Sequence, residues 1–293
     1  MLSELAENFS IVKDTFTEAS DALGFDLWKL TQEDQEGLNQ TQNTQPAMLA
    51  AGYATYRVLS NESELSPICM AGHSLGEYTA LVASGSLGFG DGIKLVRTRA
   101  ELMQSAVPAG VGAMAAILGL EDEAVVKVCA DYSGEGIVQA VNFNSNGQVV
   151  IAGNKAAVDT TCEAMKAAGA KRAVLLPVSV PSHCSLMDEA ALKFKTEVDA
   201  IQFNMGSIDV LHNVDAAKAS NIDEMKAKLI AQLHKPVLWT GTVRAMHNIG
   251  VEKLIEAGPG KVLAGLTRRI EKSLTANAVL DSASVVTTLE EIK

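Results

Sequence analysis

A serine between two glycines, in the run GHSLG at 72–76, is the side chain best placed in this chain to act as a nucleophile. The apolar run PICMA at 67–71 predicts a buried strand before it, and EYTALVAS at 77–84 predicts a helix after it. On such a strand-to-helix turn the serine oxygen is pushed out of the backbone, and the helix start offers N–H groups to a developing oxyanion. The five-residue pattern also occurs in linker turns, but this context favours Ser74 as a nucleophile for acyl chemistry.

A serine nucleophile needs a base, and the chain offers five histidines. His183, in VPSHC at 180–184, follows the last strand of a predicted subdomain, where we expect a loop that faces a cleft. His73 is a weaker candidate, because a residue beside the nucleophile points elsewhere from the turn. The remaining three, which we interpret as structural or exposed, are His212, His234 and His247. His183 is therefore the candidate base.

The acid that would orient this histidine in a full triad has no clear candidate in the sequence. Asp188, Asp209 and Asp215 all fit ordinary surface positions. The alternative is a serine and histidine dyad in which a backbone carbonyl orients the imidazole. The residue types alone leave this choice open.

Two arginines lie on the helix that is predicted over 92–106. Arg97 and Arg99 are two residues apart, so they face different directions and at most one reaches a cleft. A guanidinium there could hold a substrate carboxylate through two parallel hydrogen bonds, whereas a solvated helix position is the ordinary alternative. The run GPGK at 258–261 lacks the spacing of a phosphate-binding loop, so we expect no nucleotide site.

Composition and net charge limit the classes to which the protein can belong. The 293 residues are 47% hydrophobic and 4% aromatic, which predicts a globular α/β core in one large domain or two moderate ones. The formal net charge of −11 argues against nucleic acid or an anionic membrane as the partner. Four cysteines without C-x-x-C spacing fit reduced thiols in the cytoplasm, and no metal-ligand cluster, leader or membrane-spanning run is found in the sequence.

The elements that must position these residues begin with helices. Apolar residues spaced by three and four predict one helix over 2–23. A second helix is predicted to start at Pro46, with Thr44 or Gln45 at its cap, since the missing N–H of proline costs nothing there. No strand pattern precedes residue 65.

The predicted elements follow a different order in the middle of the chain. Between 112 and 178 the segments follow in the order strand, helix, strand, strand, helix, strand, which is the order of a ferredoxin-like subdomain. Further strands are predicted at 208–214 and 253–258, each followed by helical sequence.

These segments predict an α/β protein with two parts. A large hydrolase-like domain with a parallel sheet is formed by 1–111 and 180–293, and a ferredoxin-like subdomain is inserted at 112–179. We expect the active site in the cleft between them.

Five further segments of the sequence are GHSLGEYTALV at 72–82, LVRTRAELM at 95–103, VNFNSNGQVVIAG at 141–153, PVSVPSHCSLM at 177–187 and EAGPGKVLAGLTRRI at 256–270. Taken together, these segments resemble the standalone malonyl-CoA:acyl-carrier-protein transacylases of bacterial fatty acid synthesis. They occur in the order of that family and cover nearly the whole chain. The resemblance implies a large α/β hydrolase-like domain with a small ferredoxin-like insert, in agreement with the segment pattern.

The resemblance also implies roles for individual residues. Ser74 is similar to the family nucleophile that takes malonyl from coenzyme A, and His183 to the base that activates it, in a ping-pong mechanism through a malonyl-serine ester. Arg99 matches the arginine that pairs with the malonyl carboxylate. Gln232 matches the glutamine whose backbone carbonyl orients the histidine, which fills the missing acid position.

Two further site residues follow from the same resemblance. Leu75 is expected to give its backbone N–H to the oxyanion, and Asn144 to lie near the pantetheine arm. The implied partners are malonyl-CoA and acyl carrier protein, with neither nucleic acid nor membrane. No metal or organic cofactor is implied, and we expect a monomer. The basic clusters Lys171/Arg172 and Arg268/Arg269/Lys272 are candidate docking positions for an acidic carrier protein.

One departure from the family pattern stands at the amino terminus. Family members begin with a strand and a Gly-Gln-Gly-Ser-Gln loop ahead of the sequence that matches Met1, and we expect Met1 to be an internal methionine of a longer natural chain. The loop normally supplies a second oxyanion donor. The alternatives to malonyl transfer are therefore a serine esterase or thioesterase with the same Ser74 and His183 pair, or a truncated, impaired form that binds coenzyme A or carrier protein.

Overall fold

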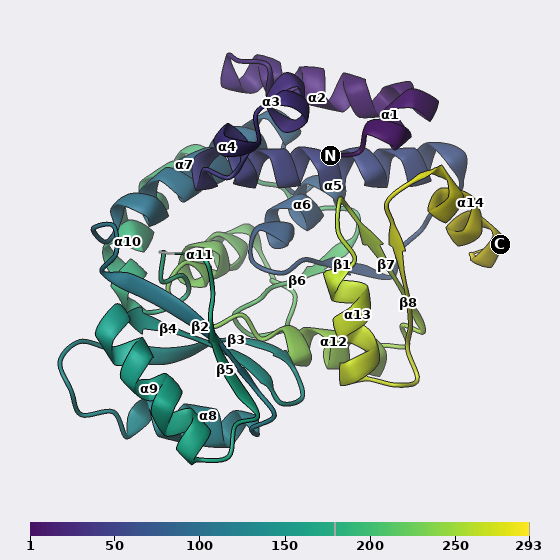
Figure 1. The fold of residues 1–293 in the computed structure, drawn as a ribbon. Helices are drawn as coiled ribbons and strands as arrows, with labels where there is room; N and C mark the ends of the chain where they lie inside the picture. Colours follow the sequence, from purple (N-terminus) through teal and green to yellow (C-terminus); the bar gives the residue numbers. More distant parts are fainter. Residues whose placement is uncertain (179, 293) are drawn as a thin grey trace. The chain divides into compact units, whose positions relative to one another are not determined.

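A computed structural model describes residues 1–178 and 180–292 (Figure 1). Packing contacts divide the chain into two compact units. Unit 1 comprises Met1–Glu101, Ala200–Leu211 and Ala245–Lys293, and unit 2 comprises Leu102–Asp199 and His212–Arg244. Ser179 and Lys293, which end the predicted insert and the predicted large domain, lie outside the described residues. The division into 1–111 with 180–293 and 112–179 stays a prediction.

Unit 1 begins with helices that pack on one another, as the apolar spacing predicts. These helices are α1 Ser3–Asn8, α2 Ser10–Leu23, α3 Leu27–Glu33, α4 Gln35–Leu38 and α5 Thr41–Glu62. The single helix predicted over 2–23 is wrong, because Phe9 is extended, with φ −130° and ψ 103°, and separates α1 from α2. The buried side chains of α2 include Val12, Phe16 and Ala19, which share one face of the helix.

The predicted start of the second long helix is also wrong. Helix α5 begins at Thr41, so Pro46 lies inside it and its first turn precedes the proline. Two side chains of that first turn hold it to the preceding segment: Asn43 Nδ2 donates to the Gly37 carbonyl at 2.9 Å and Thr44 Oγ1 to the Leu38 carbonyl at 2.6 Å. These bonds help to hold a first turn to which the proline contributes no backbone donor.

The strands of unit 1 pair in parallel. Strand β1 Cys69–Ala71 pairs with β6 Asp209–Leu211, and β7 Lys253–Ala257 pairs with β8 Thr275–Val279. The strands predicted near 208–214 and 253–258 are therefore present. Other helices that lie wholly or partly in unit 1 are α6 Leu75–Ala83, α7 Phe89–Ser105, α12 Trp239–Asn248, α13 Val262–Ile270 and α14 Ser282–Glu291. Parallel strands with helical connections confirm the predicted α/β class.

Unit 2 contains the predicted ferredoxin-like order. The elements are β2 Gly112–Leu118, α8 Asp122–Ala130, β3 Val138–Ser145, β4 Gln148–Asn154, α9 Lys155–Ala167 and β5 Arg172–Leu175. The strands form an antiparallel sheet in the order β3-β4-β2-β5. Helices α8 and α9 lie on the same face of this sheet (Figure 1), where their apolar side chains pack against alternate residues of the strands.

The opposite face of this sheet receives the segment that carries the candidate base. Cys184 is buried there against Met114, Val150 and Ala152. The chain continues through the 3₁₀ helix Ser185–Met187, α10 Asp188–Ala200 and α11 Ile222–Gln232. Of the helices in the described ranges, none is long and apolar enough to cross a membrane.

Candidate active site

Ser74 lies on the predicted turn between a strand and a helix. Strand β1 ends at Ala71, helix α6 begins at Leu75, and Ser74 between them has φ 51° and ψ −106°. In the described part of the chain, the non-glycine residues with positive φ are Leu2, Ser74, His183 and Ala216. The candidate nucleophile and the candidate base are thus both held in backbone conformations that cost about 1–3 kcal/mol and concentrate at functional sites.

The backbone of the turn at Gly72 lies very close to the start of helix α6 at Gly76. A Cβ atom there would lie 2.0 Å from the carbonyl carbon of Gly76, closer than any side-chain atom can come. The Gly76 N–H donates to the His73 carbonyl at 2.9 Å, and the Glu77 N–H to the Ser74 carbonyl at 3.2 Å. Gly72 is therefore required by the close approach of the helix start, and this approach fixes the direction in which Ser74 leaves the backbone.

Leu75 is the first residue of α6. Its N–H, like the other N–H groups of a first helical turn, has no acceptor within its own helix. The N-terminal end of a helix also carries partial positive charge. A negatively charged oxygen on a group bound to Ser74 would therefore meet a donor and a favourable dipole at this end of α6.

Arg99 reaches Ser74 from α7. Its side chain is 1% exposed, and its Nη2 donates to Ser74 Oγ at 3.1 Å. Arg97 takes a different direction: its Nη1 donates to Asn43 Oδ1 at 3.2 Å and its Nε pairs with Glu101 at 3.0 Å. The prediction that the two arginines face different directions is confirmed.

Gln45 contacts the candidate site through Arg99, and sequence reasoning missed it. Its Oε1 accepts from Arg99 Nη1 at 2.7 Å, and its side chain is buried. The sequence suggested only a cap position for Gln45, but it lies inside α5, where a buried glutamine needs a polar partner. A polar side chain on an otherwise small and apolar helix face was the signal that could have found it.

The surroundings of Arg99 are themselves polar and buried. Tyr78 and Glu77 are both fully buried on α6, and the Arg99 guanidinium lies 5.3 Å from the centre of the Tyr78 ring. Burial lowers the pKa of Arg99 and raises that of Tyr78, while the electrostatic interaction between the two groups opposes each of these shifts. The guanidinium remains a cation at neutral pH, because the ordinary pKa of arginine lies far above the neutral range.

His183 is held by a backbone carbonyl. Its Nδ1 lies 2.6 Å from the Gln232 carbonyl oxygen, and its own N–H donates to the Leu233 carbonyl at 3.0 Å. A carbonyl oxygen only accepts, so Nδ1 carries the proton and Nε2 of the neutral ring keeps its lone pair. Of the two possibilities that the residue types left open, the structure has the carbonyl orienter.

The Gln232 carbonyl lies at the last residue of α11. The final carbonyls of a helix lack partners within the helix and carry its partial negative charge. A proton arriving on Nε2 would create an imidazolium whose Nδ1–H faces that charge. The helix end can thus do what a carboxylate does in a triad, which is to fix the tautomer and stabilise the cation.

The segment after His183 is anchored to the antiparallel sheet. Cys184 Sγ donates to the Pro181 carbonyl at 3.1 Å, and the Ser185 N–H donates to Gln139 Oε1 on β3 at 2.8 Å. Burial raises the pKa of the Cys184 thiol to about 11, so it stays protonated at neutral pH. Cys184 therefore packs as a small apolar residue and holds His183 in place.

Asn144 lies on β3 at an irregular point of the sheet. The register of β3 against β4 shifts between Phe143 and Ser145, so Asn144 is the extra residue of a bulge. Bulges redirect side chains and are common beside binding sites. The residues Ser74, Leu75, Arg99 and Gln45 belong to unit 1, whereas His183, Gln232 and Asn144 belong to unit 2.

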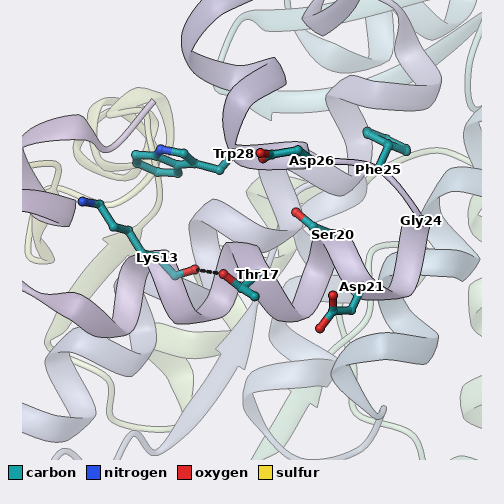
Figure 2. A pocket seen from close by; sticks show the side chains of 8 residues that line it. All are labelled: Lys13, Thr17, Ser20, Asp21, Gly24, Phe25, Asp26 and Trp28. Atoms are coloured by element: carbon teal, nitrogen blue, oxygen red, sulfur yellow. Dashed lines mark hydrogen bonds between the residues drawn. The ribbon is translucent and has the colours of Figure 1, made fainter.

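Three of the other histidines have different surroundings. His212 is buried, His247 is exposed, and His234 Nδ1 lies 2.5 Å from Asp188 Oδ1. A surface cavity among α2, α3 and the segment between them is lined by none of the predicted site residues (Figure 2). Its lining includes Lys13, Asp21 and Trp28. Within the described ranges, no three His, Cys, Asp or Glu side chains are grouped as metal ligands.

Comparisons with known proteins identify the family to which the chain belongs. Residues 9–291 match the family model described as acyl transferase domain. The chain is 51% identical over 291 residues to the malonyl CoA-acyl carrier protein transacylase of Escherichia coli K12, covering 99% of this chain and 94% of the relative. A crystal structure of an acyl carrier protein S-malonyltransferase from Vibrio cholerae is 53% identical, with a TM-score of 0.96, covering 100% of this chain and 95% of that one.

A second solved structure is a complex of a type II PKS acyl-carrier protein with its malonyl-transacylase. It is 50% identical, has a TM-score of 0.97 and covers 99% of this chain and 94% of that chain. The fold is that of an acyltransferase, and the chain belongs to the acyl transferase domain family. Within that family its similarity is to the malonyl CoA-acyl carrier protein transacylases, which confirms the resemblance drawn from the motifs.

Proposed function

We propose that the protein transfers a malonyl group from malonyl-CoA to the phosphopantetheine thiol of an acyl carrier protein, through a malonyl ester on Ser74. The observation that carries this proposal is the buried guanidinium of Arg99, which donates to Ser74 Oγ at 3.1 Å. A cation held beside a nucleophile favours an acyl group that carries its own carboxylate. The names of the relatives, and the complex of one with a carrier protein, support the same donor and acceptor.

In the first half-reaction, His183 Nε2 takes the hydroxyl proton of Ser74 as Oγ attacks the thioester carbon of malonyl-CoA. The carbonyl oxygen becomes an oxyanion beside the Leu75 N–H at the start of α6. When the carbon–sulfur bond breaks, the imidazolium returns the proton to the coenzyme A sulfur. The products are a malonyl-serine ester and free coenzyme A.

In the second half-reaction, the carrier-protein thiol gives its proton to His183 Nε2 and attacks the ester carbon. The bond to Ser74 Oγ breaks, and the proton on His183 returns to that oxygen. The Gln232 carbonyl, 2.6 Å from Nδ1, stabilises the imidazolium in both halves. Asn144, on the bulge of β3, is assigned to the pantetheine arm that coenzyme A and carrier protein share.

Arg99 sets the preference for the acyl group. In the free protein its two terminal nitrogens bind neutral oxygens, those of Gln45 and Ser74. A malonyl carboxylate is a stronger acceptor than either, and a guanidinium can bind it through two parallel bonds. An acetyl group offers no such acceptor, so it gains nothing from the buried cation.

The proposed reaction uses only side chains and backbone groups of this chain, and coenzyme A acts as the leaving group. We expect no cofactor and no metal for it, a monomeric protein, and neither nucleic acid nor membrane as partner. The four free cysteines fit the reducing conditions of the cytoplasm, where we place the protein.

The test is to give the protein malonyl-CoA or acetyl-CoA, with and without phosphopantetheinylated acyl carrier protein, and to quantify acyl-carrier protein and free acid by mass spectrometry. We expect malonyl-carrier protein as the main product and little acetyl transfer. Release of free malonate at the same rate with and without carrier protein would identify an esterase or thioesterase instead. Equal transfer of acetyl and malonyl would contradict the role of Arg99.

A further inference from the structure

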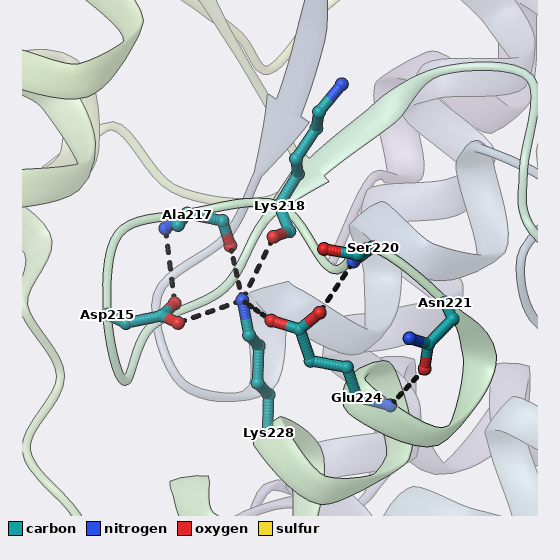
Figure 3. Close-up of polar contacts among 7 residues, drawn as sticks. All are labelled: Asp215, Ala217, Lys218, Ser220, Asn221, Glu224 and Lys228. Carbon is teal, nitrogen blue, oxygen red and sulfur yellow. Dashed lines mark hydrogen bonds and ion pairs between the residues drawn. The ribbon is translucent and has the colours of Figure 1, made fainter.

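A buried lysine on α11 lies at the centre of a polar cluster (Figure 3). The side chain of Lys228 is 8% exposed, and its Nζ is 2.8 Å from Asp215 Oδ2 and 3.0 Å from Glu224 Oε1. The same Nζ donates to the carbonyls of Ala217 at 3.3 Å and Lys218 at 3.0 Å. Two carboxylates and two backbone carbonyls thus surround one ammonium group, an arrangement that ties α11 to the preceding loop.

The loop that Lys228 holds is closed on itself. The His212 N–H donates to the Ala217 carbonyl at 3.0 Å, and the Ala216 N–H donates back to the His212 carbonyl at 2.9 Å. Ala216 has φ 55°, a left-handed conformation that an alanine adopts only when its surroundings impose it. The bonds from Lys228 to the two following carbonyls help to hold that strained turn.

The start of α11 belongs to the same cluster. Glu224 Oε2 accepts from the Ser220 N–H at 2.8 Å, while the Glu224 N–H donates to Asn221 Oδ1 at 2.9 Å (Figure 3). The Ser220 N–H and Lys228 together lower the pKa of Glu224 to about 2. Burial opposes the charge on Lys228, but its bonds to Asp215 and Glu224 outweigh burial and raise its pKa. Glu224 and Lys228 are therefore both charged at neutral pH.

The other end of α11 carries the carbonyl that orients the candidate base. Lys228 precedes Gln232 by four residues, about one helical turn or roughly 6 Å along the axis. A helix moves as a rigid body over one turn, so a shift of α11 at Lys228 is passed to the Gln232 carbonyl. The distance from that carbonyl to His183 Nδ1 is only 2.6 Å, a contact that tolerates little displacement.

We propose that Lys228 is a positioning residue for His183, because its bonds to Asp215, Glu224 and two loop carbonyls fix α11 and with it the Gln232 carbonyl. The inference rests on the proposed function of His183 as the base. Lys228 acts only through the helix and the carbonyl. Its loss should weaken the activation of Ser74 and leave the binding of malonyl-CoA unchanged.

The first test replaces the ammonium group with an apolar side chain of similar length, Lys228→Met. We expect kcat for malonyl transfer to fall roughly ten- to a hundredfold, the range that small misplacements of a catalytic group produce, with KM for malonyl-CoA unchanged. Lys228→Arg, which keeps the charge and several donors, should recover part of the loss. Lys226→Met is the matched control, because Lys226 lies on the same helix and donates to the Asp199 carbonyl instead of the loop.

Because Lys228→Met leaves two acids unpaired, its fold is checked by circular dichroism and thermal melting. If it fails to fold, Asp215→Asn and Glu224→Gln, which weaken the cluster but keep the lysine, are measured in its place. A fall in kcat in these folded variants supports the proposal. Unchanged kcat in both overturns it.

A second readout separates positioning of His183 from a general structural effect. Ser74 is modified with phenylmethylsulfonyl fluoride, a serine reagent whose reaction depends on the base but needs no malonyl group. Lys228→Met should slow this modification in the wild-type background and have no further effect in a His183→Ala background, since the two substitutions act on one group. Equal slowing in both backgrounds would overturn the proposal. Failure of malonyl transfer in the unsubstituted protein would instead contradict the proposed function.

Discussion

The proposed nucleophile, Ser74, and the proposed base, His183, are held by different kinds of structure. Ser74 is held by its immediate neighbours in sequence, through a turn in which Gly72 and Gly76 nearly touch. His183 is held by residues far away in sequence, since the carbonyl of Gln232 orients it. Local constraint of this kind leaves a sequence motif, whereas a backbone carbonyl can come from any residue type and leaves none.

A second difference concerns charge. The surroundings of Ser74 contain a buried cation, Arg99, with Gln45 as a neutral partner. The surroundings of His183 contain the partial negative charge of a helix end. The first arrangement suits an incoming carboxylate and a developing oxyanion, and the second suits a proton arriving on an imidazole. The surroundings of each residue therefore favour the charge that the proposed reaction would bring there.

The largest effect is expected from removal of the proposed base. His183→Ala should reduce kcat for malonyl transfer by roughly 10²- to 10⁴-fold, the usual contribution of general base catalysis, as measured by steady-state kinetics with carrier protein. The matched control is His247→Ala at an exposed histidine of α12, which should keep the activity of the unsubstituted protein. Activity of His183→Ala within twofold of that of the control would contradict the proposal that His183 is the base.

Removal of the buried cation should have a smaller and more selective effect. Arg99→Ala is expected to lower kcat/KM for malonyl-CoA by roughly 10²-fold or more, because it removes a pair of charge-assisted hydrogen bonds to the substrate. Transfer of acetyl should fall much less. Arg97→Ala, two residues away on the same helix, is the control and should change neither. An equal loss of malonyl and acetyl transfer would show that Arg99 does not select the carboxylate.

The elbow can be tested by its packing. Gly72→Ala places a Cβ atom where the backbone of Gly76 lies, so we expect it to lower the free energy of unfolding by about 1–3 kcal/mol and to slow acylation of Ser74. Gly76→Ala is the stability control, because a Cβ there meets no atom within 4 Å. Chemical denaturation measures both. Equal stability of the two variants would mean that the close approach at Gly72 is not required.

The smallest effect is a pH dependence of stability at Glu224. Its folded pKa of about 2 lies below the ordinary value of about 4.3, so its contribution to stability is complete above the ordinary value and is lost as the pH falls toward 2. The difference in melting temperature between the unsubstituted protein and Glu224→Gln should shrink over that window. Glu197→Gln, at an exposed position of α10, should give no such pH-dependent difference. A difference in melting temperature that grows as the pH falls would contradict the lowered pKa of Glu224.

The same contrast explains how far the sequence could predict the structure. The turn at Ser74 and the order of elements in the ferredoxin-like subdomain follow local patterns, so both could be predicted from the sequence. Helix boundaries were harder to predict: the extra turn before Pro46 is held by contacts with the preceding segment, and no local pattern indicated the break at Phe9. The pairing of Arg99 with Gln45 joins residues 54 positions apart, and no local pattern could indicate it.

The role of Gln232 shows the limit most clearly. Residue types suggested a backbone carbonyl in place of an acid, but only the resemblance to a known family indicated which one. The glutamine side chain says nothing about the carbonyl, because what matters is that α11 ends there and that His183 is within 2.6 Å. Lys228 is similar, since a lysine on a helix suggests a solvated side chain until its four oxygen partners are seen.

The central claim is that Ser74 carries the malonyl group between donor and acceptor. Intact-protein mass spectrometry after mixing with malonyl-CoA tests it most directly, with and without acyl carrier protein and with Ser74→Ala as the control. We predict a mass increase of one malonyl group that maps to Ser74, disappears on addition of carrier protein and is absent in the variant. Folded protein that transfers malonyl without such an adduct, or an adduct that persists in Ser74→Ala, would contradict the account.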